Sequence, residues 1–221
     1  MNTSAPQTSS DRCRLVLVTP PLADSVQLAE CVTAALSGGD VASVILDPGD
    51  LDEVTFQALA EKTVPIIQEK GAAAIILNET RIAGRVGADG IHIEGKAVDL
   101  REAIEKHASK MIIGTGNLRD RHSAMEIGEL QPDYIFFGKI GADNKPDAHP
   151  RNLSLAEWWA ELVEIPCIAQ AGNTLDSIIP AAKTGADFVA LCRAVFDAKD
   201  PADVVRQANR LLNDHAPRFD D

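Results

Sequence analysis

Cysteines are few in this sequence, and their spacing excludes two kinds of small scaffold. The four cysteines, Cys13, Cys31, Cys167 and Cys192, lie far apart, and none belongs to a Cys-x-x-Cys pair. Disulfide frameworks and zinc sites need denser or paired thiols. We therefore expect reduced thiols that act as small core side chains, as is typical of a cytoplasmic protein.

Long apolar runs and basic residues are also scarce. No stretch approaches the roughly 18 uninterrupted apolar residues of a membrane span, and residues 1–11 lack the charged and apolar regions of a signal peptide. The chain has 33 acidic and 21 basic residues, which gives a formal net charge of -12. Nucleic acids and anionic membranes require a basic surface. We expect neither as a partner.

Eight short apolar runs recur along the chain and resemble strands. They are residues 15–19, 41–47, 73–78, 90–93, 111–115, 133–138, 167–171 and 187–192. Each run is continuous rather than alternating, which is the pattern of parallel strands covered on both faces. Helical periodicity appears between them, at residues 26–36, 54–70, 123–130, 155–163 and 176–184. Strand and helix therefore alternate.

This alternation predicts an α/β fold, a (β/α)8 TIM barrel in a single domain. A Gly-Ala turn from helix to strand recurs at Gly71, Gly87 and Gly185, and its repetition favours a closed barrel over a doubly wound open sheet, the alternative. We expect the barrel to span residues 12–214, after a disordered lead-in at 1–11 and before a C-terminal tail at 215–221.

The residues after the last two runs predict a phosphate site, because barrel active sites lie in the loops that follow the strands. Gly172 and Asn173 follow the seventh run, and Arg193 follows the eighth. A glycine lets backbone amides approach an oxyanion, and an arginine adds a guanidinium fork. The alternative is an ordinary tight turn and a surface arginine.

The loop after the sixth run is basic in an otherwise acidic chain. Gly138 ends the run, and Lys139, Lys145 and Arg151 follow within thirteen residues. Such a loop at a barrel mouth predicts a small anionic ligand.

Carboxylates and an amide follow the third and fourth runs. Asn78, Glu79, Glu94 and Asp99 offer the oxygen ligands that Mg2+ prefers. Acidic residues are also common at helix N-termini, where they interact favourably with the dipole, so helix capping is the alternative. His92, inside the run Gly-Ile-His-Ile, is expected to be a hydrogen-bonded core residue rather than a base.

Ordered landmarks across residues 15–201 carry a family resemblance. They are Leu-Val-Leu-Val-Thr, Ile-Ile-Leu-Asn-Glu, Gly-Ala-Asp-Gly-Ile-His-Ile, Ile-Ile-Gly-Thr-Gly, Asp-Tyr-Ile-Phe-Phe-Gly, Ile-Pro-Cys-Ile-Ala-Gln-Ala-Gly and Gly-Ala-Asp-Phe-Val-Ala-Leu. In this order they resemble the thiamine phosphate synthase family and its relative, the thiazole tautomerase family. Both families are (β/α)8 barrels.

The resemblance implies a thiamine-phosphate diphosphorylase-like transferase that couples an aminopyrimidine diphosphate to a thiazole phosphate in thiamine biosynthesis, with Mg2+ as cofactor. Its ligands are thus small phosphorylated heterocycles, and a homo-oligomer is left open.

Several matching residues carry over from the family. Asn78 matches an asparagine that touches substrate, Lys145 a lysine that grips diphosphate, and Gly172 a glycine of the thiazole phosphate cradle, which backbone near Leu191 and Cys192 completes. Glu79 replaces the metal-binding aspartate of the family.

Other positions depart from the family, mostly where it binds diphosphate. Asp47 and Gly49 stand where the family has an arginine and a lysine after the second strand. At ~4 Å in a surface-like dielectric, this reversal turns an attraction of a few kcal/mol into a repulsion. Gly116, Ala142 and Asn144 replace hydroxyl side chains. The diphosphate clamp is therefore degenerate in this chain.

Three hypotheses follow. The first is a synthase whose clamp is rebuilt from Lys139, Lys145, Arg151 and Arg193. The second is a tautomerase-like enzyme on a phosphorylated heterocycle, with Lys139 or His92 as proton carrier. The third is a non-catalytic barrel that only binds a phosphorylated ligand.

Overall fold

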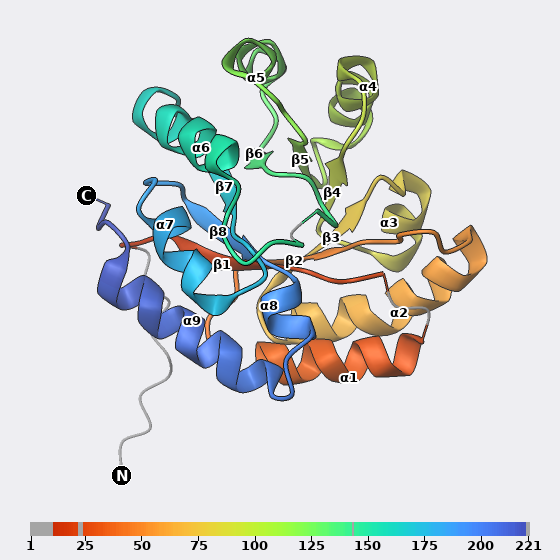
Figure 1. The fold of residues 1–221 in the computed structure, drawn as a ribbon. Helices are drawn as coiled ribbons and strands as arrows, with labels where there is room; N and C mark the ends of the chain where they lie inside the picture. The colour runs from red at the N-terminus through yellow and green to blue at the C-terminus, as the bar shows by residue number, and fades with distance from the viewer. Residues whose placement is uncertain (1–10, 22–23, 143, 220–221) are drawn as a thin grey trace.

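Eight parallel strands close into a barrel in the order β1-β2-β3-β4-β5-β6-β7-β8, with β8 pairing back onto β1. The computed structural model describes residues 11–21, 24–142 and 144–219. The strands are β1 Arg14–Val18, β2 Ser43–Leu46, β3 Ala73–Leu77, β4 Gly90–Ile93, β5 Ile112–Gly116, β6 Tyr134–Phe137, β7 Cys167–Gln170 and β8 Phe188–Leu191. Figure 1 shows them surrounded by helices.

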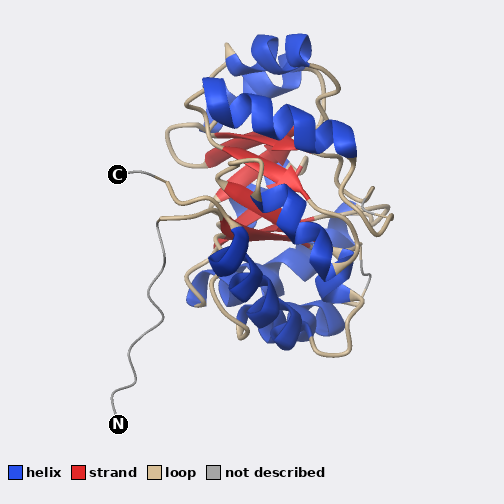
Figure 2. Ribbon diagram, turned by 60° about the vertical axis from the view of Figure 1, so that its left-hand side comes forward, coloured by secondary structure: helices blue, strands red, loops and turns tan. Residues whose placement is uncertain are grey.

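Helices cover the outside of the barrel, as Figure 2 shows. They are α1 Ser25–Leu36, α2 Glu53–Glu69, α3 Thr80–Val86, α4 Ala97–His107, α5 Arg121–Gly128, α6 Pro150–Leu162, the 3-10 turn η1 Leu175–Ser177, α7 Ile178–Ala182, α8 Arg193–Phe196 and α9 Pro201–His215. The predicted single-domain TIM barrel is confirmed. The helical periods missed α3, α4, α8 and α9. The short connection after β3 holds α3, which is only seven residues long.

The core has two layers, because a barrel strand buries one face inside the barrel and the other beneath the helices. Tyr134, Phe136 and Ile168 belong to the inner layer, whereas Phe137 and Trp159 belong to the outer one. Gly114 of β5 is required beside the inner layer, since a Cβ there would overlap the ring of Tyr134. The bulky residues of β6 therefore fill the space that β5 leaves.

The recurring Gly-Ala-Asp turn has a structural role that its repetition alone does not reveal. Asp89 and Asp187 of this turn each stand just before a strand and accept a backbone N–H of the preceding strand in the barrel, both at 2.8 Å. Asp133, which follows Gln131-Pro132 instead, makes the same contact at 2.7 Å. A carboxylate bonded in this way satisfies an N–H at the start of a strand. The motif fixes the register of neighbouring strands at the end of the barrel opposite the mouth.

The two described ends of the chain meet. Arg12 forms an antiparallel bridge with Arg218, and the Phe219 N–H donates to the carbonyl of Asp11 at 2.8 Å. The expected lead-in lies outside the described residues except for Asp11, and the part of the expected tail up to residue 219 is tied to the start of the barrel.

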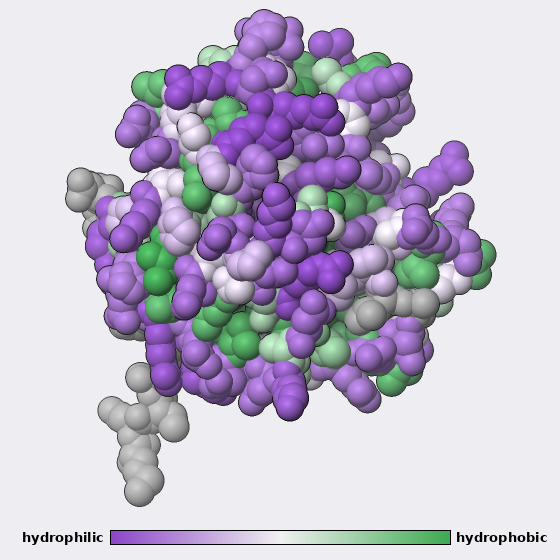
Figure 3. Space-filling model, in the orientation of Figure 1, coloured by the Kyte–Doolittle hydropathy of each residue, from purple (hydrophilic) through white to green (hydrophobic). Residues whose placement is uncertain are grey.

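Figure 3 shows a mainly hydrophilic face, with hydrophobic atoms in small groups. Among the described helices, none is both long and apolar enough to cross a membrane. The four cysteines are free thiols, as expected.

Candidate active site

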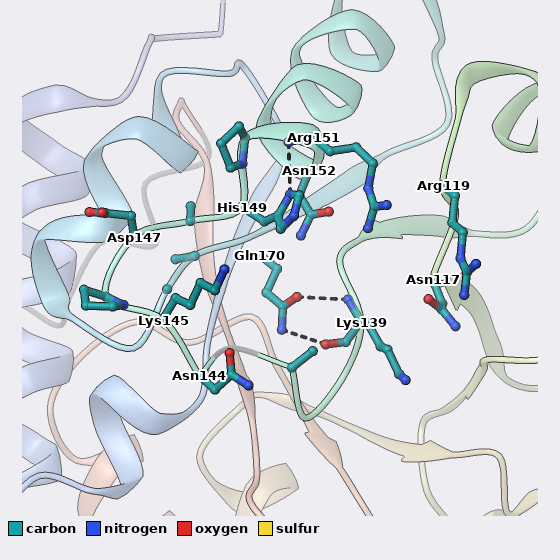
Figure 4. A pocket seen from close by; sticks show the side chains of 16 residues that line it. Asn117, Arg119, Lys139, Asn144, Lys145, Asp147, His149, Arg151, Asn152 and Gln170 are labelled. Atoms are coloured by element: carbon teal, nitrogen blue, oxygen red, sulfur yellow. Dashed lines mark hydrogen bonds between the residues drawn. The ribbon is translucent and has the colours of Figure 1, made fainter.

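A cavity of about 620 Å³ opens at the ends of β5, β6 and β7, beside the start of α6. Figure 4 shows the side chains that line it. They are Asn117, Arg119, Lys139, Ala142, Asn144, Lys145, Pro146, Asp147, Ala148, His149, Pro150, Arg151, Asn152, Gln170, Ala171 and Gly172. The structure thus brings four sequence-predicted site residues to one place: Lys139, Lys145, Arg151 and Gly172.

The cavity wall is basic. Arg119, Lys139, Lys145 and Arg151 line it, and Asp147 is the only acidic residue among its described lining. None of the four cations makes an ion pair within 4 Å with another described residue. In a chain of net charge -12, this concentration of positive charge is suited to an anion.

Gln170, at the end of β7, fixes the backbone of Lys139. Its Oε1 accepts the Lys139 N–H at 2.9 Å, and its Nε2 donates to the Lys139 carbonyl at 3.0 Å. Gln170 is buried, so both bonds lie in a shielded environment. Gly138 permits this contact, because a Cβ there would overlap Oε1 of Gln170. The amide thus extends the pairing of β6 with β7 past the strand ends and holds Lys139 at the cavity.

The loop from β6 to α6 is anchored on the turn after β7. The Asn173 N–H donates to the carbonyl of Lys145 at 2.8 Å, and the Thr174 hydroxyl donates to that of Pro146 at 2.8 Å. A Cβ on Gly172 would overlap the Pro146 carbonyl oxygen. Gly172 is therefore needed for the loop to approach closely, which positions Lys145.

The predicted phosphate cradle at Gly172 and Asn173 is engaged within the protein. The Gly172 N–H donates to the Ser177 hydroxyl at 2.9 Å, and the Asn173 N–H donates to the Lys145 carbonyl. A phosphate held by these amides would have to displace both bonds. Side chains, rather than the backbone of this turn, supply the free donors of the cavity.

The start of α6 closes another side of the cavity. His149 is the N-cap, Pro150 follows it, and the Nδ1 atom of His149 accepts the Arg151 N–H at 3.2 Å. Proline suits the first helical position because its missing N–H needs no partner there. Arg151 is exposed toward the cavity, while Asn152 is buried in its wall.

Arg193, Leu191 and Cys192 do not line this cavity. Leu191 is buried beneath the helices, and Cys192 faces the barrel interior. Arg193 starts α8 and lies 3.7 Å from Asp197. Arg193 is therefore not part of the cationic wall of this cavity, and its role in the clamp stays a prediction.

The residues expected to bind Mg2+ do not belong to a cluster of three or more metal-ligating side chains in the described part of the chain. Among the described residues, no group of three or more His, Cys, Asp or Glu could hold a metal ion. Asp99 Oδ2 accepts the Lys96 N–H at 2.8 Å and completes a capping box at the start of α4. Asp99 therefore caps a helix, which is the alternative to metal binding that its position in the sequence left open. Glu79 precedes α3 without a side-chain cap.

Asn78 lies outside the basic cavity. It lines a separate hollow of about 370 Å³ with Glu94, Asp99 and Lys106, and its Oδ1 accepts the Glu94 N–H at 2.8 Å. Its left-handed φ of 59° makes asparagine a suitable residue at this turn. Its position favours a role in shaping the loop after β4.

Two carboxylates lie at the mouth against the first residues of the loop after β6. Glu94 Oε1 accepts the Ile140 N–H at 3.0 Å, and burial raises the pKa of Glu94, although Lys139 opposes the shift. Asp47 Oδ1 accepts the Gly49 N–H at 2.9 Å, and burial also raises the pKa of Asp47. Asp47 therefore offers no anion contact at the end of β2.

His92 is a core residue, as expected, and cannot carry protons at the mouth. It is fully buried, its Nδ1 lies 2.9 Å from the Tyr134 hydroxyl, and burial lowers its pKa to about 3. Its Nε2 has no hydrogen-bond partner among the residues that the structure describes. A Cβ at Gly116 would come within 2.9 Å of this atom, which explains why the residue at this position is small.

Four polar or charged residues of the cavity were given no role from the sequence, namely Arg119, His149, Asn152 and Gln170. The position of Arg119 could have predicted a place at the barrel mouth, since it lies three residues past the end of β5. Nothing in the sequence predicts the role of Gln170, because it belongs to an apolar strand and acts through a contact with Lys139, just after β6.

Comparisons with known proteins agree on one family. The family model described as thiamine monophosphate synthase matches residues 15–195. The chain is 34% identical to a thiamine-phosphate synthase of Rhodospirillum centenum over 205 residues, 90% of this chain and 98% of the relative. It is 32% identical to a thiamine-phosphate synthase of Hyphomonas neptunium, with 91% and 94% of the two chains covered.

Solved structures show the same fold. A thiamine phosphate pyrophosphorylase from Pyrococcus furiosus matches with a TM-score of 0.76 at 21% identity, over 93% of this chain and 98% of that one. A 3-hexulose-6-phosphate synthase matches with a TM-score of 0.71 at 15% identity, over 89% and 99%. At these identities the likeness supports the barrel alone.

Proposed function

Because this chain belongs to the thiamine monophosphate synthase family, we propose that it is a transferase that couples an aminopyrimidine diphosphate to a thiazole phosphate in thiamine biosynthesis. The tautomerase alternative is not favoured, since His92 is buried and neutral and the named relatives are synthases. The non-catalytic alternative is not favoured either, because the similarity to enzymes covers nearly the whole chain.

The proposed reaction exchanges one bond for another. The bond between the methylene carbon of the pyrimidine and the diphosphate oxygen breaks, and its electron pair leaves with the diphosphate. The thiazole nitrogen then donates its lone pair to the carbon cation, which forms the new C–N bond of thiamine phosphate. No proton has to move. The site therefore needs cations that stabilise a leaving group rather than a general base.

The observation that carries this proposal is the basic cavity at the mouth of the barrel. Lys139, Lys145 and Arg151 provide donors for phosphate oxygens, and charge-assisted hydrogen bonds of this kind are each worth about 1.5–3 kcal/mol. Negative charge builds up on the diphosphate as the bond breaks, so these contacts strengthen toward the transition state. Lys145 occupies the position of the family's diphosphate-gripping lysine.

Gly172, Asn173 and Gly138 belong to this proposal as the frame of the cavity, because they hold the Lys145 loop and the Gln170–Lys139 contact in place. Asn78 is kept as a residue that shapes the neighbouring loop. Mg2+ is implied by the family resemblance, but no step is assigned to it, because the described carboxylates do not form a site for it. We also propose a cytoplasmic location, which rests on the pattern of free cysteines.

The test is a coupling assay with the aminopyrimidine diphosphate, the thiazole phosphate and Mg2+, with thiamine phosphate measured after oxidation to its fluorescent form. We expect product from the wild-type protein and a loss of roughly tenfold or more in kcat/KM for Lys145→Ala. Lys110→Ala, at an exposed lysine outside the cavity, is the matched control and should be unaffected. Product no higher than in a protein-free reaction would contradict the proposal.

A further inference from the structure

Arg119 is a basic residue of the cavity to which neither the sequence patterns nor the family resemblance gives a role. It lies on the loop between β5 and α5, and its side chain lines the cavity together with those of Lys139, Lys145 and Arg151. In Figure 4, Arg119 and Lys145 lie on opposite sides of the cavity, with Arg151 and Lys139 between them. The basic wall therefore extends from the loop after β6 to the loop after β5.

We infer that the diphosphate is held between the β5–α5 loop and the start of α6, with Arg119 as a binding residue on the β5 side. The family resemblance places the diphosphate between the end of β2 and Lys145; the inferred position keeps Lys145 and exchanges β2 for the β5–α5 loop. The identity of the ligand rests on the proposed function, whereas the location rests on the cavity and its charges.

The direction of the β5–α5 loop is fixed by its backbone. Asn117 has a left-handed φ of 62°, and its N–H donates to the carbonyl of Gly138 at 3.0 Å. This bond ties the start of the loop to the end of β6, next to Lys139. Arg119, two residues later, is therefore placed on the same cavity as Lys139 by backbone contacts and not by a side-chain partner.

The charges around Arg119 distinguish it from structural arginines. Arg14 pairs with Asp40 at 2.6 Å, and Arg206 pairs with Asp203 at 2.8 Å. Arg119 has no such ion pair with a described residue, and its neighbours on the wall are also cations. Like charges that converge on a cavity repel one another, and an anion between them removes that repulsion.

The acidic side of the mouth makes β2 unsuitable for the same anion. Asp47 follows β2 and is half-buried, and Glu94 follows β4 and bonds to the Ile140 N–H. Both side chains would repel a diphosphate. Two phosphate groups in one ligand match four cations better than a single phosphate does. A diphosphate is therefore the ligand class that this wall favours.

The test compares the binding of inorganic pyrophosphate and inorganic phosphate by isothermal titration. We expect the wild-type protein to prefer pyrophosphate, and Arg119→Ala to lose pyrophosphate affinity roughly tenfold or more, with little change for phosphate. Arg119→Lys should fall in between, because lysine keeps the charge but not the planar fork. Arg121→Ala is the matched control: Arg121 lies over the ring of Trp158, 5.0 Å from its centroid, and does not line the cavity.

Unchanged pyrophosphate affinity in Arg119→Ala, an equal loss in Arg121→Ala, or no binding of pyrophosphate to the wild type would each overturn the inference. The coupling assay tests the proposed function separately from the binding site. If no thiamine phosphate forms but pyrophosphate binding depends on Arg119, the proposed function is wrong and the site stands. If coupling proceeds equally well in Arg119→Ala, the function stands and the site is wrong. Melting temperatures of the variants show whether each remains folded.

Discussion

Gln170 illustrates how an uncharged residue can organise a charged site. Its amide makes two hydrogen bonds to the backbone of Lys139, at 2.9 and 3.0 Å. It therefore acts as a positioning residue, through Lys139. Removal of the Gln170 amide would leave the Lys139 N–H and carbonyl without hydrogen-bond partners. Each unsatisfied group costs about 1–3 kcal/mol.

Replacing Gln170 by leucine, of similar size, should separate positioning from folding. We expect Gln170→Leu to raise KM for the aminopyrimidine diphosphate and to weaken pyrophosphate binding, since Lys139 is no longer held at the cavity. Gln170→Glu keeps the acceptor but loses the donor, so it should retain the Lys139 N–H bond. Steady-state kinetics and titration of both variants provide the measurement. If KM and affinity stay at wild-type values while only the melting temperature falls, Gln170 has a structural role alone.

His92 makes the stability of the barrel depend on pH. Burial lowers its pKa to about 3, from an ordinary value of 6.5. Between these two pH values the unfolded state binds a proton on this imidazole and the folded state does not. Its contribution to stability is complete above pH 6.5 and is lost as the pH falls toward 3. Over that window the free energy of unfolding should decrease by about 1.4 kcal/mol per pH unit.

His92→Gln should flatten this dependence. We expect the variant to be less stable than the wild type near pH 7.5, and the difference to shrink as the pH is lowered to 5. Urea unfolding at several pH values measures it. His122→Gln, at an 84% exposed side chain, is the control and should leave the slope unchanged. A parallel pH profile for His92→Gln would show that the imidazole is not the responsible group.

At the residue scale, the sequence predicts the site only in part. Lys139, Lys145 and Arg151 were predicted because basic residues stand out in an acidic chain. Gln170 could not be predicted, because its role depends on a contact with a residue 31 positions away. Arg193 stays a prediction: it does not line the cavity, because the position after β8 does not determine where a long side chain points.

At the scale of elements, the β6–α6 loop depends on Gly172. The Lys145 and Pro146 carbonyls accept bonds from Asn173 and Thr174, and the loop lies directly against the α-carbon of Gly172. The strands were predictable because apolar runs reveal buried parallel strands. This loop packing was not, since a Gly-Asn turn has the same sequence whether it holds a loop or an anion.

Gly172→Ala should displace the loop and leave the barrel intact. The added methyl group overlaps the Pro146 carbonyl, so we expect a stability loss of about 1–3 kcal/mol and weaker pyrophosphate binding, because Lys145 moves away. Gly84→Ala is the matched control, since a Cβ within α3 meets no atom within 4 Å. It should keep binding and gain up to about 1 kcal/mol. Normal binding in Gly172→Ala would show that the loop does not depend on this contact.

At the scale of the whole molecule, charge is divided across the mouth of the barrel. The chain carries a net charge of -12, yet the wall between β5 and α6 is basic, while Asp47 and Glu94 lie on the side of β2 and β4. The closed order of eight strands separates β2 from β6 around the barrel, although the start of the loop after β6 reaches Asp47, which lies 3.9 Å from the position of a Cβ on Gly141. The barrel itself was predictable from the alternation of strands and helices. This division was not, because it depends on which loops converge in space.

Asp47 does not line the basic cavity, so we expect it to act on a bound anion through its electrostatic field rather than by contact. Asp47→Asn should tighten pyrophosphate binding only modestly, by about two- to fivefold at low salt, as expected for a charge that does not contact the anion. The gain should vanish near 0.5 M salt, where screening is effective over roughly 4 Å. The loss caused by Arg119→Ala should persist there, because a contact pair is screened less. Titration at low and high salt separates the two cases. A large gain in Asp47→Asn that survives high salt would place the diphosphate beside β2, because only a carboxylate in direct contact with the anion escapes screening.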